Sequence, residues 1–290
     1  MTPKKFEYLR PESLEQAVEF LNENSESKVL AGGQSLIALM KLRLAEPKYL
    51  VDIGRIRDLS YIKMADGGKI AIGALTTHEQ VEESDLLRQY CPILPQMARQ
   101  IGDPQIRTRG TIGGSVAHAD PSGDPPTVVL ALDAELKVIG PNSERIIPAA
   151  KFFKGAFSTA LEPNEILTEV RVPTLGPEWS TVYQKYAWRE GDFAIVGFAG
   201  AIKLEGRTVR GARFSFASMG DTPIRAIHLE REILNKTLSE NTIKEMSELS
   251  LEATSPASDV HVSAEFRKNA AKNIVRRFLA ESVAKVEGGR

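Results

Sequence analysis

Apolar residues in the first part of the chain recur with two different periods. Leu14, Ala17, Val18 and Leu21 keep the spacing of one helix face, and Ser13 has the residue type of a helix N-cap. Short apolar runs bounded by polar or glycine-containing stretches predict strands instead. The predicted strands are 28–31, 49–53, 69–75, 135–139 and 166–172, and the further predicted helices are 35–44, 84–101 (broken or kinked at its prolines) and 127–134. Strands alternating with helices predict an α/β N-terminal half.

The pattern changes after residues 175–179, LGPEW, which have the composition of a linker. Consecutive strands are predicted next, and Glu205-Gly206-Arg207 is typical of a hairpin turn between two of them. From residue 224 the chain is predicted to be mainly helical, ending in a long amphipathic segment over 264–286. The predicted strands of this half are 182–188, 194–204 and 209–217. Strands followed by helices predict an α+β unit.

Composition narrows the possible functions. Lys+Arg 37 against Asp+Glu 38 gives a formal net charge of −1, so no basic field favours nucleic acid or anionic lipid. The longest apolar run, 193–202, is too short to span a bilayer, and no apolar segment follows the basic start as in a signal peptide. We therefore expect a cytoplasmic protein without stable membrane insertion. The one cysteine, Cys91, cannot hold an iron–sulfur cluster by itself and is expected to be a buried thiol.

Two stretches contain adjacent glycines next to small polar residues. Gly32-Gly33-Gln34-Ser35 lies between a predicted strand and a predicted helix, and Thr111 to Ser115, TIGGS, repeats its chemistry. Glycines allow positive φ and close backbone approach, and exposed N–H groups bind phosphate. Neither stretch is a P-loop or a GxGxxG fingerprint. Either could be an ordinary turn, but together they are what clamping a diphosphate from two sides would require.

The residues after the second stretch raise the possibility of a metal site. His118, Asp120 and Asp124 carry ligand side chains, but a proline- and glycine-rich loop favours a turn-forming role, and no second His/Cys cluster completes a shell. We therefore predict no metal; Asp124 could instead accept hydrogen bonds from ligand hydroxyls. Ser35 and Ser115 lack a catalytic triad, so no catalytic residue is predicted. His78, after two threonines typical of a helix cap, is expected to be structural.

With both stretches in view, the chain resembles a known family. AGGQSLIALMKLRL followed by DPQIRTRGTIGGSVAHADPSGDPP is similar to the FAD-binding medium subunit of molybdenum hydroxylases, which include carbon monoxide dehydrogenase, aerobic aldehyde dehydrogenases and xanthine dehydrogenase. FEYLRPESLEQAV, YQKYAWREGDFAIVGFA and SPASDVHVSAEFRKNAAKNIVRRFL extend the likeness along the whole chain. The resemblance implies an α+β protein: a vanillyl-alcohol-oxidase-type FAD domain over 1–174, with subdomains of about 1–55 and 56–174, and a C-terminal α+β domain over 175–290.

The resemblance also implies which residues hold the cofactor. The two glycine stretches would wrap the FAD pyrophosphate chiefly through backbone amides, Leu167 would contact the cofactor through its backbone, and Ile101, Lys185 and Phe193 would lie near the isoalloxazine. Some relatives have tyrosine or isoleucine in place of Phe193, and asparagine or aspartate where Ser115 stands. The implied cofactor-binding residues are Ala31, Gly32, Gly33, Gln34, Ser35, Leu36, Ile101, Thr111, Ile112, Gly113, Gly114, Ser115, Asp124, Leu167, Lys185 and Phe193.

The function implied by the resemblance is electron transfer within a complex. A molybdopterin-binding large subunit would oxidise the substrate, and electrons would pass through the 2Fe-2S clusters of a small subunit to FAD on this chain, then to an external acceptor. The assembly expected is a dimer of heterotrimers. Some relatives carry an inserted cysteine-ligated cluster in this subunit, which the single Cys91 excludes here. The substrate (CO, an aldehyde, a purine or another N-heterocycle) and the acceptor stay open.

Two other functions remain open at this stage. A stand-alone flavin oxidase of the same fold would need a catalytic base and often attaches FAD covalently, for which His118 is the only candidate in the loop. A nucleotide-binding regulatory or phosphotransferase module would use the glycine stretches for ATP, but the chain lacks a P-loop lysine there. Release of flavin on denaturation tests the first alternative, and ATP-versus-FAD binding tests the second.

Overall fold

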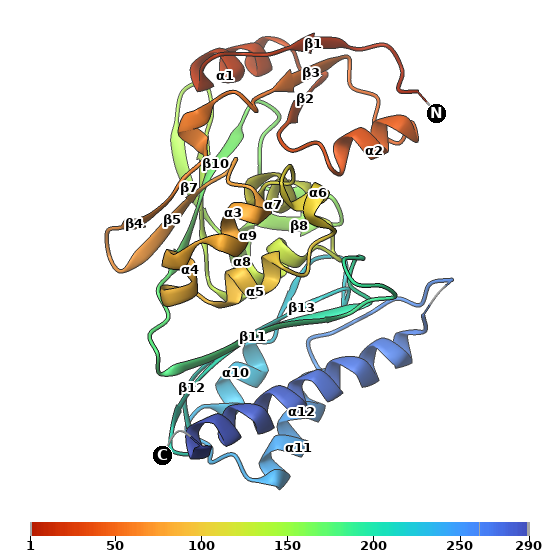
Figure 1. Ribbon diagram of the computed structural model, residues 1–290. Helices are drawn as coiled ribbons and strands as arrows, with labels where there is room; N and C mark the ends of the chain where they lie inside the picture. Colours follow the sequence, from red (N-terminus) through yellow and green to blue (C-terminus); the bar gives the residue numbers. More distant parts are fainter. Residues whose placement is uncertain (1, 261, 289–290) are drawn as a thin grey trace.

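A computed structural model describes residues 2–260 and 262–288, whose three larger β-sheets are stacked along one axis (Figure 1). The first sheet is three-stranded and parallel, in the order β1-β3-β2. Its helix α1 buries Ala17, Val18 and Leu21, and Ser13 Oγ accepts a hydrogen bond from the amide of Gln16, so the predicted helix and its cap are confirmed. The elements are β1 (Glu7–Leu9), α1 (Leu14–Glu23), β2 (Ser27–Leu30), α2 (Leu36–Lys41), β3 (Tyr49–Asp52) and the 3₁₀ turn η1 (Arg57–Leu59).

The second sheet is five-stranded and entirely antiparallel, in the order β4-β5-β10-β6-β7. The α/β description predicted from the periodicity therefore holds for the first sheet only. The sequence pattern could not show this, because strand direction depends on connections between β5 and β10 almost a hundred residues apart. The strands are β4 (Ile62–Ala65), β5 (Lys69–Gly73), β6 (Glu135–Ile139), β7 (Glu144–Pro148) and β10 (Ile166–Pro173), with a two-stranded β8 (Phe153–Gly155) and β9 (Ser158–Thr159) beside them.

Helices pack over one face of the second sheet and share its core. The predicted helix over 84–101 is broken at Cys91-Pro92, as its prolines suggested, and the predicted helix over 127–134 begins earlier, at Asp124. The second glycine stretch is not a loop: Thr111 is the N-cap of a helix that contains both glycines. The helices are α3 (His78–Glu83), α4 (Asp85–Tyr90), α5 (Ile93–Ala98), α6 (Pro104–Arg107), α7 (Ile112–His118), α8 (Asp124–Ala131) and α9 (Ala149–Phe152).

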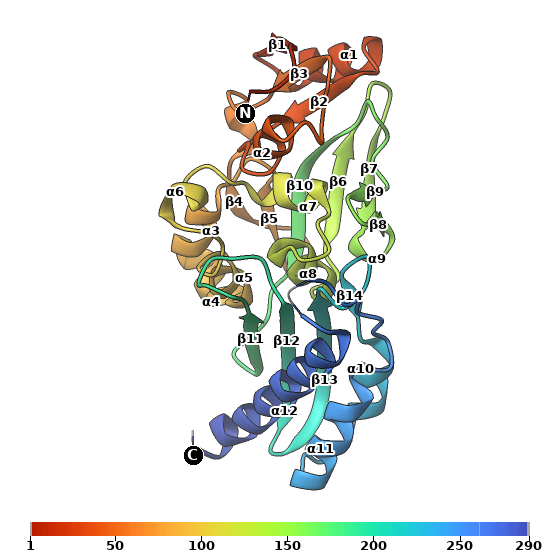
Figure 2. The ribbon, with the colours of Figure 1, turned by 90° about the vertical axis from the view of Figure 1, so that its right-hand side faces the viewer.

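The third sheet lies between helices from both halves of the chain (Figures 1 and 2). Helices α5 and α8 pack on one of its faces, while α10 and α12 cover the other, where Phe198, Phe214 and Phe278 form a buried cluster. The sheet is antiparallel in the order β11-β12-β13-β14. Its elements are β11 (Trp179–Tyr186), β12 (Val196–Glu205), β13 (Thr208–Ala217), β14 (Ile224–Arg225), α10 (Ile227–Ile233), α11 (Glu240–Leu249) and α12 (Ala264–Gly288). Within the described residues, no helix is both long and apolar enough to cross a membrane.

Arg225 fastens the third sheet to the end of α8. Its guanidinium donates to the Leu130 carbonyl at 2.8 Å and to the Asp133 carboxylate at 2.6 Å, and it also pairs with Glu230. We expect Arg225→Ala to lower the free energy of unfolding by about 2 kcal/mol, because the buried Leu130 carbonyl and the half-buried Glu230 lose their charged donor. Denaturant unfolding of the full chain measures this. Arg210→Ala, which removes an arginine 46 % exposed and paired with Glu205, is the control and should cost under about 1 kcal/mol. Equal losses would show that Arg225 adds nothing beyond a surface pair.

Candidate functional site

The two glycine stretches, far apart in sequence, lie against each other. A Cβ placed on Gly32 would be 2.1 Å from the carbonyl oxygen of Arg109, and one on Gly114 would be 3.6 Å from the Cβ of Ala31. Two non-hydrogen atoms cannot approach to 2.1 Å without a bond, so only glycine at position 32 allows this contact. The structure therefore brings together the two halves of the site that the sequence suggested.

The first stretch presents backbone N–H groups without partners. Gly33 has φ 78°, in the left-handed region, and turns the chain between β2 and α2. Within the described residues, the N–H groups of Gly32, Gly33, Gln34 and Ser35 donate no hydrogen bond, and the Ser35 side chain does not cap α2. Gly32, Gly33, Ser35 and the following Leu36 are half-buried, whereas Gln34 is exposed. Successive unpaired amides suit an anion with several acceptor oxygens, such as a diphosphate.

The second stretch uses its own amides within the protein. Ile112 donates to the Thr76 carbonyl and Gly113 to the Ala74 carbonyl, each at 3.0 Å, and Gly114 donates to Thr111 Oγ1 at 3.1 Å. Ile112 and Gly113 are buried, and a Cβ on Gly113 would lie 2.4 Å from the Cβ of Ala74. The sequence expectation of free amides in 111–115 is therefore not met. This stretch offers a ligand close approach at Gly114 and the side chain of Ser115, while Ile112 and Gly113 contact the segment just after β5, at Thr76 and Ala74.

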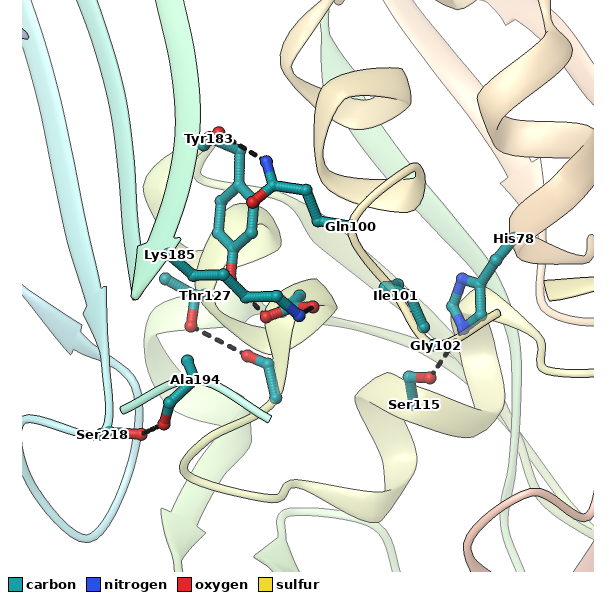
Figure 3. Close-up of polar contacts among 12 residues, drawn as sticks. His78, Gln100, Ile101, Gly102, Ser115, Thr127, Tyr183, Lys185, Ala194 and Ser218 are labelled. Atoms are coloured by element: carbon teal, nitrogen blue, oxygen red, sulfur yellow. Dashed lines mark hydrogen bonds and ion pairs between the residues drawn. The ribbon is translucent and has the colours of Figure 1, made fainter. Parts of the chain in front are cut away.

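His78 contacts the second stretch at Ser115 (Figure 3). Its Nε2 lies 3.0 Å from Ser115 Oγ, and its amide donates to the Gly110 carbonyl at 2.9 Å. Burial, with a smaller effect of the nearby Arg107 charge, lowers the pKa of His78 to about 4, so the imidazole is neutral at neutral pH. Its Nδ1 is buried and has no partner among the described residues. The structural role expected for His78 takes the form of holding the Ser115 hydroxyl in place.

Asp124, at the start of α8, forms a buried polar cluster with Tyr183 and Lys185. Figure 3 labels Tyr183 and Lys185. The Tyr183 hydroxyl donates to Asp124 Oδ1 at 2.5 Å, and Lys185 Nζ lies 2.7 Å from Oδ2. The Asp124 and Lys185 side chains are 6 % and 5 % exposed. Burial raises the pKa of Asp124 above its usual value, although Lys185 and the Tyr183 hydroxyl oppose the shift. Each carboxylate oxygen has one partner and keeps one free acceptor position, so Asp124 can still receive a hydroxyl from a ligand.

The loop after α5 and the loop between β11 and β12 meet through two glycines. The Gly102 amide donates to the Gly191 carbonyl at 3.1 Å, and a Cβ on Gly191 would be 2.5 Å from the Gly102 oxygen. This contact brings the β11–β12 loop, whose Phe193 is 62 % exposed, against the loop that contains the half-buried Ile101. The two residues implied to border the isoalloxazine from these loops therefore lie in adjoining segments.

The remaining candidates fall in the interior or in turns. Leu167 is 5 % exposed in β10, at a bulge opposite β6, so only its backbone could reach a ligand. Asp120 Oδ1 accepts a hydrogen bond from the Ser122 amide at 2.8 Å, and His118 packs on the Phe157 ring. These contacts agree with the turn-forming role expected for this segment. Within the described residues, no group of three or more His, Cys, Asp or Glu could hold a metal ion. Cys91 is a buried thiol as expected, and burial raises its pKa to about 12.

Three residues that form or support the cluster were not found from the sequence: Tyr183 within it, and Gln96 and Gln100 beside it. Gln96 Oε1 accepts from the Tyr183 amide at 3.1 Å, and Gln100 Nε2 donates to the Tyr183 carbonyl at 2.8 Å. Two signals were available in the sequence. Tyr183 and Lys185 are two apart in a predicted strand and so share a face, and Gln96 and Gln100 are four apart, as neighbours on a helix are. Neither signal could show that this strand packs against this helix.

Comparisons with known protein families match nearly the whole length of the chain. The family model "FAD binding domain in molybdopterin dehydrogenase" matches residues 4–175, and "CO dehydrogenase flavoprotein C-terminal domain" matches residues 181–282. The glyceraldehyde dehydrogenase medium chain of Sulfolobus acidocaldarius is 36 % identical over 97 % of this chain and 99 % of its own. The carbon monoxide dehydrogenase medium chain of Hydrogenophaga pseudoflava is 35 % identical over 96 % of this chain and 97 % of its own.

The folds of these relatives agree equally well. A solved structure of carbon monoxide dehydrogenase from Hydrogenophaga pseudoflava contains a chain that superposes with a TM-score of 0.94 at 36 % identity, covering 98 % of this chain and 99 % of that one. Quinoline 2-oxidoreductase from Pseudomonas putida 86 contains a chain with a TM-score of 0.93 at 30 % identity, covering 99 % of both. The likeness in fold therefore extends over nearly the whole chain.

Proposed function

Because this chain belongs to the FAD-binding medium subunits of the molybdenum hydroxylases, we propose that it holds FAD between its two glycine stretches and passes electrons from the iron–sulfur clusters of a partner subunit to an external acceptor. The protein is thus an oxidoreductase subunit. The molybdopterin and the 2Fe-2S clusters are carried by a large and a small partner subunit, and we propose a dimer of such heterotrimers as the assembly.

The observation that carries the proposal is the run of unpaired amides beside the Gly32–Arg109 contact. Four successive N–H groups, from Gly32 to Ser35, have no partner among the described residues. Unpaired buried or half-buried amides cost free energy unless a ligand or water satisfies them. A pyrophosphate supplies several acceptor oxygens and two negative charges at this place, so the residues present fit the group.

The chain positions the cofactor, and the cofactor supplies the redox chemistry. In the proposed arrangement the first glycine stretch would bind the pyrophosphate, and Ser115, held by His78, would add a hydroxyl. The free acceptor positions of Asp124 would receive hydroxyls of the cofactor. Lys185 and Phe193 border the ring system, and Phe193, being 62 % exposed, is placed to cover it or to meet a partner. With a single cysteine, the chain cannot supply the thiolates of an iron–sulfur cluster.

The visible absorption spectrum of the purified full chain tests the proposal. We expect a yellow protein with flavin absorption bands, and FAD as the compound identified by chromatography after denaturation, since nothing indicates a covalent attachment. Without its partner subunits, the chain should reduce artificial acceptors weakly at most and should oxidise neither aldehydes nor purines. A colourless chain that binds no added FAD would end the proposal, and flavin that stays with the denatured chain would favour the stand-alone oxidase.

A further inference from the structure

The carboxylate of Asp124 depends on a strand from the other half of the chain. Helix α8 begins Asp124-Pro125-Pro126, and prolines have no N–H group, so the first turn has few backbone donors to offer the carboxylate. Its two partners are Tyr183 and Lys185, which are 59 and 61 residues away on β11. The position of Asp124 is therefore set by where β11 lies.

Strand β11 is an edge strand, and two glutamines fix it beside the FAD-binding half. The outward-facing amide and carbonyl of Tyr183 bond to Gln96 Oε1 and Gln100 Nε2, on α5 and the turn after it. A slip of one residue in β11 would turn Tyr183 and Lys185 to the opposite face of the sheet. The two glutamine side chains thus hold both the edge and the register of the strand.

The neighbouring strand leaves room for the Tyr183 hydroxyl. Lys185 pairs with Gly197 of β12 in the antiparallel register. A Cβ on Gly197 would lie 2.9 Å from the Tyr183 hydroxyl oxygen and 3.0 Å from the Cβ of Ala217. The absence of a side chain at Gly197 is what lets the hydroxyl reach Asp124.

Resting on the proposed function, we propose that Tyr183 is a positioning residue of the FAD site. Its backbone is held by Gln96 and Gln100, and its hydroxyl fixes the Asp124 carboxylate against Lys185. The affinity for FAD therefore depends on how the third sheet packs against the FAD-binding half. Tyr183 itself is 3 % exposed, and it acts through Asp124 without touching the cofactor.

The charges around Asp124 determine how the loss of the Tyr183 hydroxyl would appear. Strand β11 contributes Lys185 and Tyr183, and the loop before α8 contributes Asp120. Helix α5 and the turn after it contribute the neutral Gln96 and Gln100. Burial raises the pKa of Asp124, and the hydroxyl and Lys185 lower it. Without the hydroxyl the pKa of Asp124 rises further, so Asp124 gains its proton at a higher pH. On acidification, the affinity for FAD therefore starts to fall at a higher pH.

Tyr183→Phe in the full chain, freed of flavin and titrated with FAD by fluorescence, tests the proposal. We expect the dissociation constant to rise about tenfold at neutral pH, since a hydrogen bond to a charged group is lost. The fall in affinity on acidification should begin at a higher pH than in the wild type. Tyr186→Phe is the matched control, because it makes the same change one residue beyond Lys185, at a side chain that is 38 % exposed. It should leave the FAD dissociation constant and its pH dependence unchanged.

Two further variants separate positioning from simple loss of stability. In an Asp124→Asn background, Tyr183→Phe should change the FAD dissociation constant by less than about twofold, because the group through which it acts is gone. Gln100→Met, which keeps the bulk and removes the donor to β11, should weaken FAD about threefold. A lower unfolding midpoint with an unchanged dissociation constant and pH profile would overturn the proposal, as would equal losses in the two Asp124 backgrounds. A wild-type chain that binds no FAD would instead refute the proposed function itself.

Discussion

Gly33→Val should abolish FAD retention in a chain that still folds. Gly33 has φ 78°, and a Cβ there would lie 3.2 Å from the side chains of Leu30 and Ile37. A β-branched residue is strongly disfavoured in the left-handed region, so the peptide would rotate and redirect the amides of the first glycine stretch. Loss of two or more charge-assisted bonds to the pyrophosphate weakens binding on the order of 100-fold or more. Absorbance of the purified variant and an FAD titration measure the effect.

Gly67→Val is the matched control for this change. Gly67 has φ 70°, in the turn between β4 and β5, and a Cβ there would meet nothing within 4 Å. Both variants should lose roughly 1–2 kcal/mol of unfolding free energy from backbone strain. Only Gly33→Val should lose FAD. If Gly33→Val bound FAD normally, or if Gly67→Val lost it equally, the assignment of the first glycine stretch to the pyrophosphate would be wrong.

Lys185→Met should destabilise the chain itself by about 3 kcal/mol, even without FAD. Lys185 and Asp124 are each almost fully buried, and removing one member of a buried ion pair leaves the other charge uncompensated. The double variant Lys185→Met/Asp124→Asn should recover most of the loss, because a neutral amide needs no counter-charge. Lys203→Met is the control: Lys203 is 41 % exposed and pairs with Glu178 at 3.2 Å, so its removal should cost under about 1 kcal/mol. Denaturant unfolding of the flavin-free wild type and of the three variants measures these differences.

The deficit of Lys185→Met should depend on pH in a definite direction. Burial already raises the pKa of Asp124, and loss of Lys185, which lowers it, raises it further. An acid whose pKa is raised by folding destabilises the protein above that pKa, and protonation relieves the cost as the pH falls. The difference from the wild type should therefore shrink as the pH is lowered from alkaline to mildly acidic values. A deficit that is constant over this range, or a double variant less stable than the single one, would show that the pair is not the source.

Local patterns identified many elements because they depend on neighbouring residues. The spacing of Ala17, Val18 and Leu21 and the cap at Ser13 depend only on the chain around them, and α1 forms where they predict it. The break at Cys91-Pro92 and the hairpin at Gly206, which has φ 59°, are equally local. The strands β1, β4, β7, β8 and β9, which are two to five residues long, were not predicted from the sequence.

The second glycine stretch shows where local chemistry was insufficient. Two adjacent glycines disfavour a helix, and the sequence accordingly suggested a loop. Carbonyls of Ala74 and Thr76, in the segment just after β5, accept the amides of Gly113 and Ile112 and fix the first turn of α7. Glycine is required at position 113 because α7 packs on Ala74 there too closely for a side chain. A tertiary contact therefore outweighed the local propensity.

The sequence by itself determined which residue types could grip a cofactor: two glycine pairs, a serine in the second stretch, an aspartate before two prolines and a lysine in a strand. It also determined the family, through motifs that extend over the chain. Only the tertiary structure decided that Gly32 meets Arg109, that the amides of the first stretch are free while those of the second are used, and that Asp124 takes its partners from β11. The reason is physical: these contacts join segments about 60 to 80 residues apart, and their existence depends on strand register and sheet docking, which local propensities do not specify.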